Sequence, residues 1–402
     1  AAALTGVGLF TPILMLINAF AMLAGSGGAP RAAISMGKKD NATAEKILGN
    51  CFSLLILMAV ALTVIFFAFA PQLLTIFGAS DKTLPYGVSY ARIYILGSIF
   101  VLIVMGMNPF ITTQGFAKIS MKTVLIGAIC NIILDPLFIF AFHMGVKGAA
   151  VATILSQAVS AVWVFSFLNG KQTKLRIRKE YLKVQPQIIL PVMGLGLAPF
   201  VMNITESLIN IAFNASLSKY GGDVAVGAMT ILASIMQLQF MPVQGLGQGA
   251  QPIISYNFGA GQTKRVKDSF KLLLKIDLSY STFMWLLVML FPAGFASIFT
   301  SDQALLTFTA HALRIYMASI LLFGIQMACQ MTFTSIGNAK ASIIVAVTRK
   351  FILLLPLIYI MPHIFTADQT SAVYMAEPIA DFLAICFTSI LFRFEFKKAL
   401  AR

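Results

Sequence analysis

Charged side chains are scarce in this sequence, and acidic ones are the scarcest. Only 11% of the 402 residues are charged, with 14 acids against 29 bases, whereas 59% are hydrophobic. A soluble protein of this length would have about a quarter of its residues charged. The scarcity of charge therefore excludes an ordinary soluble fold and indicates that lipid surrounds most of the surface.

Cysteine and histidine are also rare, which excludes several kinds of site. They are Cys51, Cys130, Cys329, Cys386, His143, His311 and His363. The cysteines lie inside apolar segments without paired spacing, and the histidines lack the spacing of metal ligands, so we expect neither disulfides nor a zinc site. An intramembrane enzyme would also need a nucleophile with a base, and no such set appears. We therefore expect no enzymatic activity and no cofactor.

The basic residues give the chain a formal net charge of +15 and cluster in short gaps between apolar runs. Loops rich in Lys and Arg stay on the cytoplasmic side of a membrane. The gap 171–183 holds six bases and one acid, Glu180, so we place this loop in the cytoplasm, together with the C-terminus. Because the bases do not interleave with aromatic residues on a polar domain, we expect no nucleic-acid partner.

Apolar runs long enough to cross a bilayer follow one another along the whole chain. A helix needs about 20 apolar residues for one crossing, and backbone groups in lipid must be satisfied within the segment, which requires helices. The pattern therefore predicts an all-α polytopic membrane protein. The predicted spans are 8–34, 47–70, 87–114, 119–142, 148–168, 187–216, 224–256, 269–292, 307–335, 341–362 and 372–393.

The two halves of the chain repeat each other. Arg92-Ile93-Tyr94 and the turn Gly115-Phe116-Ala117-Lys118 return 222 residues later as Arg314-Ile315-Tyr316 and Gly337-Asn338-Ala339-Lys340. Six helices follow the basic loop and five precede it, so we expect two six-helix bundles with the first helix missing from this chain. An even number of helices per bundle gives a parallel pseudo-twofold repeat. The predicted lobes are 1–170 and 187–402, joined by the linker 171–186.

Asp135 is the strongest functional candidate. An ionisable residue in the hydrocarbon is energetically costly, so its presence there suggests a function. Asn131 lies four residues earlier, on the same helix face, and Pro136 follows directly. A carboxylate beside an amide oxygen can hold a proton or Na⁺. The second half keeps the proline, as Pro356, but has Leu355 in place of the acid. This asymmetry favours a functional role over the alternative of a structural, paired aspartate.

Other polar residues in the predicted spans are weaker candidates. Glu206 could titrate or attract a cationic substrate, with Asn203 and Asn210 on neighbouring turns. We expect Arg349 and Lys350 to pair with Glu377 or Asp381 or to extend to the interface, and Asp277 to be interfacial. A glutamine-rich and methionine-containing stretch could line a substrate chamber, although close helix packing explains its glycines equally well. The chamber candidates are Gln237, Gln239, Met241 and Gln248.

With these residues, the sequence resembles the multidrug and toxic compound extrusion (MATE) transporters, in particular their prokaryotic DinF-like and MepA-like branch. The resemblance rests on Asn131-Ile-Ile-Leu-Asp135-Pro136, on Gly245-Leu-Gly-Gln-Gly-Ala-Gln-Pro-Ile-Ile-Ser-Tyr-Asn-Phe-Gly-Ala-Gly261 and on the paired Gly-x-Ala-Lys turns. It implies twelve helices in two lobes, in the inner membrane of a prokaryote. It also implies a first-lobe cation site, completed by an acid on the first helix. The site residues implied in this chain are Asp135, Asn131, Thr153, Asn108 and Tyr90.

The resemblance implies export of lipophilic, often cationic compounds by a monomer, in exchange for H⁺ or Na⁺. Glu206 matches an acid used by another branch, whereas Gln248 stands where some multidrug members have glutamate, which weakens the expectation of a broad cationic range. A flippase for lipid-linked oligosaccharides is the main alternative, but it should have a more arginine-rich cavity. An ion channel is disfavoured by the twofold repeat with a single asymmetric acid.

Overall fold

A computed structural model describes residues 2–401, with side chains from residue 5, and every regular element in this range is helical. The long elements are α2 (Thr11–Gly37), α3 (Asn41–Ile76), α6 (Ala117–Pro136), α7 (Val146–Asn169), α8 (Pro186–Gly259), α9 (Thr263–Leu290) and α15 (Gln369–Leu400). The shorter ones are α1 (Ala2–Gly8), α4 (Leu84–Leu96), α5 (Ser98–Thr113), α10 (Pro292–Ser297), α11 (Gln303–Tyr316), α12 (Phe323–Ser335), α13 (Ala339–Val347) and α14 (Leu355–Ile364). Four π or 3-10 segments complete them: η1 (Leu137–Ala141), η2 (Lys179–Tyr181), η3 (Ile320–Leu322) and η4 (Thr348–Leu354).

The helices account for every predicted membrane span. Eight continuous helical segments among the described residues are long and apolar enough to cross a bilayer, and two bent pairs add two more. One of the eight, α8, is interrupted at Gly222, whose φ of 65° is not helical, so α8 holds two predicted spans. Glycine tolerates this conformation because it has no Cβ. The described chain thus contains a helical segment for each of the eleven crossings that the sequence predicts.

The internal repeat is also visible in the backbone. The pair α4–α5 bends by 52°, and its counterpart, α11 followed by η3 and α12, bends by 46°. The second segments, Ser98–Thr113 and Ile320–Ser335, are offset by the 222 residues of the sequence repeat. Gly115 and Gly337, which end these segments, both have positive φ, of 91° and 75°. The repeated glycines are therefore explained by a turn that disfavours other residues.

Short polar side chains fix where several helices begin. Asp40 accepts a hydrogen bond from the backbone N–H of Thr43 at the start of α3, and Asn338 does the same for Ala341 at the start of α13. Asp368 caps α15 through Ser371. Such caps satisfy N–H groups that the first helical turn leaves unpaired. Hydrogen bonding by Thr43 also lowers the pKa of the exposed Asp40 carboxyl.

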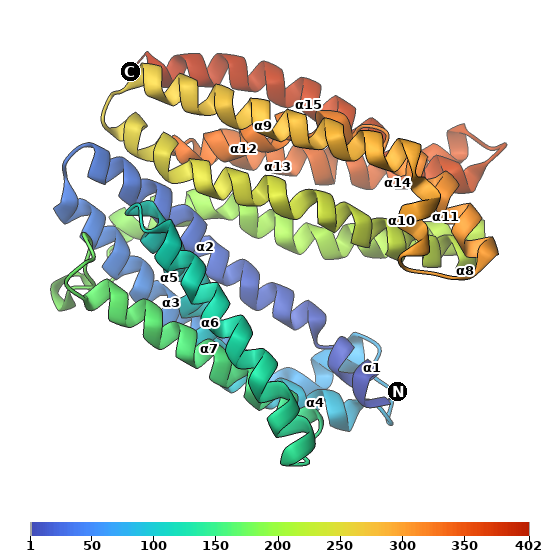
Figure 1. Cartoon of the computed structure of the whole chain (residues 1–402), viewed down its shortest axis with the longest axis horizontal. Coiled ribbons are helices and arrows are strands. Elements are labelled where there is room, and N and C mark those ends of the chain that lie inside the picture. Colours follow the sequence, from blue (N-terminus) through green and yellow to red (C-terminus); the bar gives the residue numbers. More distant parts are fainter. Residues whose placement is uncertain (1, 402) are drawn as a thin grey trace. The chain divides into compact units, whose positions relative to one another are not determined.

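The helices form two compact units, one ending at Asn203 and the other beginning at Ile204. In the first unit α2, α3 and α5 pack on one another and α6 pairs with α7, as Figure 1 shows. In the second unit α9 packs against α12, and α15 against α12, α14 and η4. Each unit has its own buried apolar core, for example around Phe110 in the first and Phe213 in the second.

The first part of α8 belongs to the first unit because glycines let it approach α2 closely. A Cβ placed on Gly196 would overlap the Leu23 carbonyl oxygen, and one on Gly27 would overlap that of Val192. Small residues at such a crossing allow backbones in a membrane to come into contact. The division by packing, after Asn203, therefore falls later than the lobe boundary expected at residue 187.

We predict that Gly196→Ala destabilises the first unit. The added methyl group meets backbone atoms of α2 that cannot rotate away, so the helices must separate, at a cost of about 1–3 kcal/mol. Thermal unfolding of the purified protein in detergent measures the effect. Gly249→Ala is the matched control, because no atom lies within 4 Å of a Cβ at that glycine. Equal melting temperatures for both variants would contradict the close α2–α8 contact.

Candidate functional site

A polar group in the first unit assembles around Asp135, from three helices. Asp135 and Asn131 lie one turn apart on α6, with their side chains near each other. The Tyr90 side chain, on α4, lies near Thr153 of α7 and near Asp135. Tyr90 is buried, whereas Asn131, Asp135 and Thr153 are partly exposed. The structure thus brings together four of the five residues expected at the cation site.

The register between α6 and α7 explains why these residues meet. The Ser160 hydroxyl of α7 donates to the Thr123 carbonyl of α6 at 3.0 Å, and Gly127 leaves room for Ser160 beside it. Because the two helices run in opposite directions, Thr153 comes level with the end of α6 that carries Asp135. Pro136 follows, and the π-helical segment η1 begins there, a local distortion that often marks functional positions.

Several polar atoms of this group have no hydrogen-bond partner among the described residues. They include Asp135 Oδ1 and Asn131 Nδ2, and Gln157 Oε1 on α7 is likewise unpartnered. Gln157 lies one turn after Thr153 on α7, and only that i, i+4 spacing could have identified it from the sequence. Buried polar atoms are almost always paired, so this group has the capacity to take a further ligand. Its oxygens suit a proton or a hard monovalent cation.

Asn108 does not join this group. Its side-chain amide donates to the carbonyl of Ser120 at 3.3 Å, near the start of α6. Ser120 is 15 residues before Asp135, which is about 22 Å along a helix at 1.5 Å per residue. The expectation that Asn108 lines the Asp135 site is therefore corrected. The reason is that α5 presents this residue to the opposite end of α6.

The second unit contains a cluster of five charged residues, four of which are buried. Arg349 donates to Asp381 at 2.6 Å and to Glu377 at 3.1 Å, which confirms the predicted pairing with the last helix. Lys350 instead forms an ion pair with Glu206 of α8 at 3.0 Å. Both bases lie in the π-helical η4. The cluster thus contains two bases and three acids, and the interior bases are both paired.

Glu206 is the most accessible member of this charged cluster. Its side chain is 52% exposed, whereas that of Lys350 is 7% exposed. Asn203 and Asn210 follow the spacing of one helix face with Glu206, and the Asn203 amide donates to the Pro199 carbonyl at 2.8 Å. The exposed side of the Glu206 carboxylate is therefore accessible to a cation, while its buried side is bound to Lys350.

The expected chamber residues of α8 divide into two groups. Gln237, Met241 and Gln248 are exposed and lie on one face, since they are separated by four and seven residues. Gln239 points the other way: it is fully buried and its amide donates to the Ser281 hydroxyl of α9 at 3.0 Å. The structure therefore places three of the four candidates on an accessible face and Gln239 inside the unit.

The expectation that Asp277 is interfacial is wrong. This residue lies at the middle of α9 and has no exposed surface. Gly324 of α12 packs directly against the backbone at Asp277, where a Cβ would lie 2.6 Å from its carbonyl carbon. The nearby lysines indicated an interface, but both α9 lysines of this stretch are exposed on another face of the helix.

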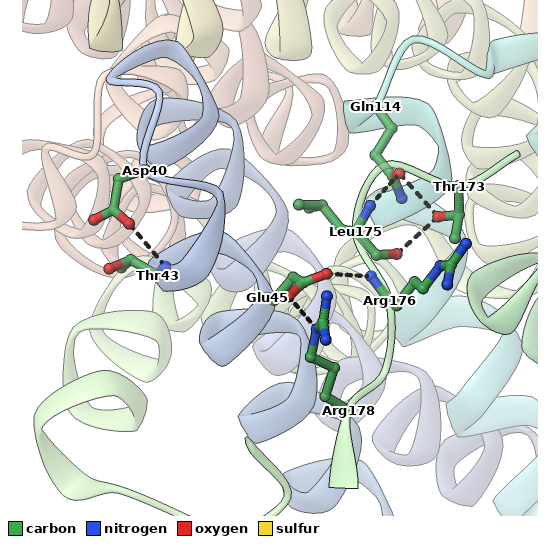
Figure 2. A network of polar contacts seen from close by, with 8 residues as sticks. All are labelled: Asp40, Thr43, Glu45, Gln114, Thr173, Leu175, Arg176 and Arg178. Atoms are coloured by element: carbon green, nitrogen blue, oxygen red, sulfur yellow. Dashed lines mark hydrogen bonds and ion pairs between the residues drawn. The ribbon is translucent and has the colours of Figure 1, made fainter. Parts of the chain in front are cut away.

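The basic segment 171–183 is held against the first unit by two buried acceptors (Figure 2). Gln114 Oε1 accepts hydrogen bonds from the Thr173 hydroxyl and from the backbone N–H groups of residues 174 and 175. Glu45 accepts from the Arg176 N–H and pairs with the Arg178 side chain at 2.5 Å. The Glu45 carboxylate raises the pKa of Arg178. The linker is therefore ordered by contacts that its composition does not reveal.

We predict that Gln114→Leu loosens this segment. The substitution removes the acceptor of two backbone N–H groups, and a buried group left unpaired costs about 1–3 kcal/mol. Trypsin should cleave after the exposed linker bases about tenfold faster, because about 1.4 kcal/mol changes the open population tenfold. Gln172→Leu, at an exposed neighbouring position, should leave cleavage unchanged. Equal rates for the two variants would show that Gln114 does not hold the linker.

Comparison with known proteins gives consistent matches. The sequence matches the MatE family over residues 1–137 and 199–360. It is 25% identical over 384 residues to the multidrug export protein MepA of Staphylococcus haemolyticus (strain JCSC1435), covering 95% of this chain and 84% of that protein. MepA of Staphylococcus aureus (strain N315) is 26% identical over 367 residues, covering 90% and 80%.

Solved structures share the fold. The crystal structure of MATE in complex with MaL6 superimposes with a TM-score of 0.93 at 23% identity, covering 100% of this chain and 90% of that one. A MOP superfamily transporter from Pyrococcus furiosus Vc1 (DSM3638), described as having a binding pocket of reverse polarity, superimposes with a TM-score of 0.92 at 24% identity, covering 100% and 89%. These likenesses establish the architecture of a polytopic helical membrane protein.

Proposed function

Because this chain belongs to the MatE family, we propose that it is a secondary transporter that exports lipophilic or cationic small molecules in exchange for H⁺ or Na⁺. The curated relatives are multidrug export proteins. The observation that carries the proposal is the group around Asp135, a carboxylate with an unpartnered oxygen and, among the described residues, no basic side chain bound to it. Such a group binds and releases a cation more readily than a paired acid does.

The exchange follows from alternating access. A cation that enters from outside binds Asp135, Asn131 and the Thr153–Tyr90 pair and favours the state that releases substrate outward. Substrate that binds from the cytoplasm or inner leaflet favours the state that releases the cation. The two ligands need only differ in their preference for the two states by a few kcal/mol. Asn131 and Asp135 are the residues that would contact Na⁺ if sodium is the coupling ion.

The substrate chamber is expected along the exposed face of α8 that carries Gln237, Met241 and Gln248. Flexible methionine and neutral amides suit varied lipophilic compounds, and the half-exposed Glu206 adds an attraction for cations. Flipping of a lipid diphosphate is less well supported, because it needs free bases, and Arg349 and Lys350 are both paired with carboxylates. We propose that the protein works as a monomer in the inner membrane, with segment 171–183 and the C-terminus in the cytoplasm.

Efflux of ethidium from energised cells tests the proposal and identifies the coupling ion. We expect cells that express the protein to lose ethidium faster than cells with an empty vector. A protonophore in sodium-free medium should abolish the difference if H⁺ is the coupling ion, and sodium should restore it if Na⁺ is. Efflux equal to the empty-vector rate under all conditions, with the protein present in the membrane, would contradict drug export.

A further inference from the structure

Asp277 is a buried carboxyl group that the proposed exchange does not use. It is the fifteenth of the 28 residues of α9, so it lies about 20 Å from either end of that helix by the rise per residue. It has no exposed surface. Neither of its carboxyl oxygens has a hydrogen-bond partner among the described residues. An unpaired, ionised carboxylate in such a place would cost many kcal/mol.

A second acceptor lies one turn away. Ser281 follows Asp277 by four residues on α9 and accepts the amide of Gln239, whose own carbonyl oxygen is buried without a partner. All three side chains are fully buried. Both Asp277 oxygens and the Gln239 side-chain oxygen are thus buried acceptors without a partner among the described residues, and a proton on Asp277 would satisfy part of this deficit.

No base faces Asp277 from the elements packed against α9. The stretch of α8 from residue 224 to 255, η3 and α10 contain no titratable residue, and α12 contains only Cys329. On α9 itself the Tyr280 hydroxyl donates to the Leu238 carbonyl, and the lysines are exposed. On α11, His311 and Arg314 lie with the end of α9 around residues 290–294, and the third titratable residue is the buried Tyr316, which is not a base. The last helix, α15, also meets α9, where Phe392 stacks on Phe270. Its bases Arg393, Lys397 and Lys398 are exposed, and its acids Glu377 and Asp381 bind Arg349. A salt bridge therefore cannot stabilise the charged form.

From this geometry we propose that Asp277 is a proton-binding site in the second unit, neutral in the state described here, and that it exchanges its proton during transport. A proton fits better than a metal ion, because the neighbouring oxygens are too few to replace a hydration shell. Once protonated, the carboxyl becomes a donor and can pair with a carbonyl of its own helix. The bend between α11 and α12, next to the Gly324 contact, supplies a place where the packing over Asp277 can open.

The proposed protonation of Asp277 does not depend on the proposed function, whereas the exchange of its proton during transport does. Infrared spectroscopy of the reconstituted wild-type protein at neutral pH should show the carbonyl stretch of a protonated carboxylic acid, which shifts in heavy water. Asp277→Asn should remove that component. Asp268→Asn, at an exposed position of the same helix, should not. A loss of intensity only from the carboxylate bands in Asp277→Asn would overturn the proposal.

The exchange is tested by transport against pH. Asparagine mimics a carboxyl that never loses its proton, so Asp277→Asn should keep the wild-type melting temperature but lose at least about tenfold in ethidium efflux or lose its pH dependence. Wild-type efflux with an unchanged pH profile would show that the proton does not exchange. If Asp277→Asn does not fold, Asp277→Ser, which also removes the carboxyl group, is compared with the wild-type protein in the same infrared measurement. Absence of ethidium transport in the wild type would contradict drug export without altering the infrared result.

Discussion

Asp135→Asn is expected to reduce ethidium efflux about 10- to 100-fold, the range of typical coupling free energies between two ligands. The substitution keeps the size and most of the hydrogen-bonding capacity of the side chain but removes the charge that would attract the coupling cation. Because Asp135 is partly exposed and has no ion-pair partner among the described residues, its removal leaves no opposite charge stranded. The amount of protein in the membrane and its melting temperature should therefore stay at the wild-type values.

The efflux measurement compares wild type, Asp135→Asn and Asp81→Asn at matched expression. Asp81 lies exposed in the turn before α4, so its substitution makes the same chemical change away from the site and should leave efflux unchanged. Full activity of Asp135→Asn would remove this residue from the coupling mechanism and would direct attention to Glu206 and Asp277.

Arg349→Met is expected to have the largest effect on stability, about 3–5 kcal/mol, because it leaves buried acids without their base. Arg349 is the shared partner of Glu377 and Asp381, all three are nearly inaccessible, and Phe323 stacks on the guanidinium at 5.3 Å. The Ser319 hydroxyl is the other partner of Asp381, at 3.4 Å. Thermal unfolding in detergent, monitored by loss of the monodisperse peak, measures the change.

Two further variants make this stability test specific. Arg393→Met removes an exposed arginine from the same region of the chain as the acids and should shift the melting temperature little. Replacing Arg349 together with both acids, by Met, Gln and Asn, should recover most of the stability, since no charge is then stranded. A melting temperature for Arg349→Met indistinguishable from that of wild type would contradict the buried network.

The span pattern and the repeat could be predicted because each rests on local properties. Hydropathy identifies a crossing wherever about 20 apolar residues occur. Each half contains a bent helix pair that ends in a glycine with positive φ, and this shared structure requires similar residues at the corresponding positions of both halves. The pairing of Arg349 with the last helix was also predictable, because a base in the hydrocarbon requires an acid and few acids are available.

Side-chain placement around the sites was less accessible to sequence reasoning. In a membrane protein, lipid-facing and core-facing positions are equally apolar. The sequence therefore shows little hydrophobic periodicity from which the orientation of a given side chain could be predicted. Asn108 and Asp277 were misplaced for this reason: each required knowledge of which helix packs opposite. Gln157 and the acceptor Gln114 were missed because a single neutral amide gives no signal until the segment it faces is known.

The proposed transport cycle exchanges substrate for a cation at Asp135, and counterflow in proteoliposomes tests this exchange most directly. Protein is reconstituted into vesicles, an ethidium gradient is imposed, and internal pH and Na⁺ are followed with indicator dyes. We predict that ethidium movement drives H⁺ or Na⁺ in the opposite direction in wild-type vesicles and that Asp135→Asn abolishes this ion flux. Ethidium movement without any ion flux in wild type, or the same ion flux in the variant, would contradict the account.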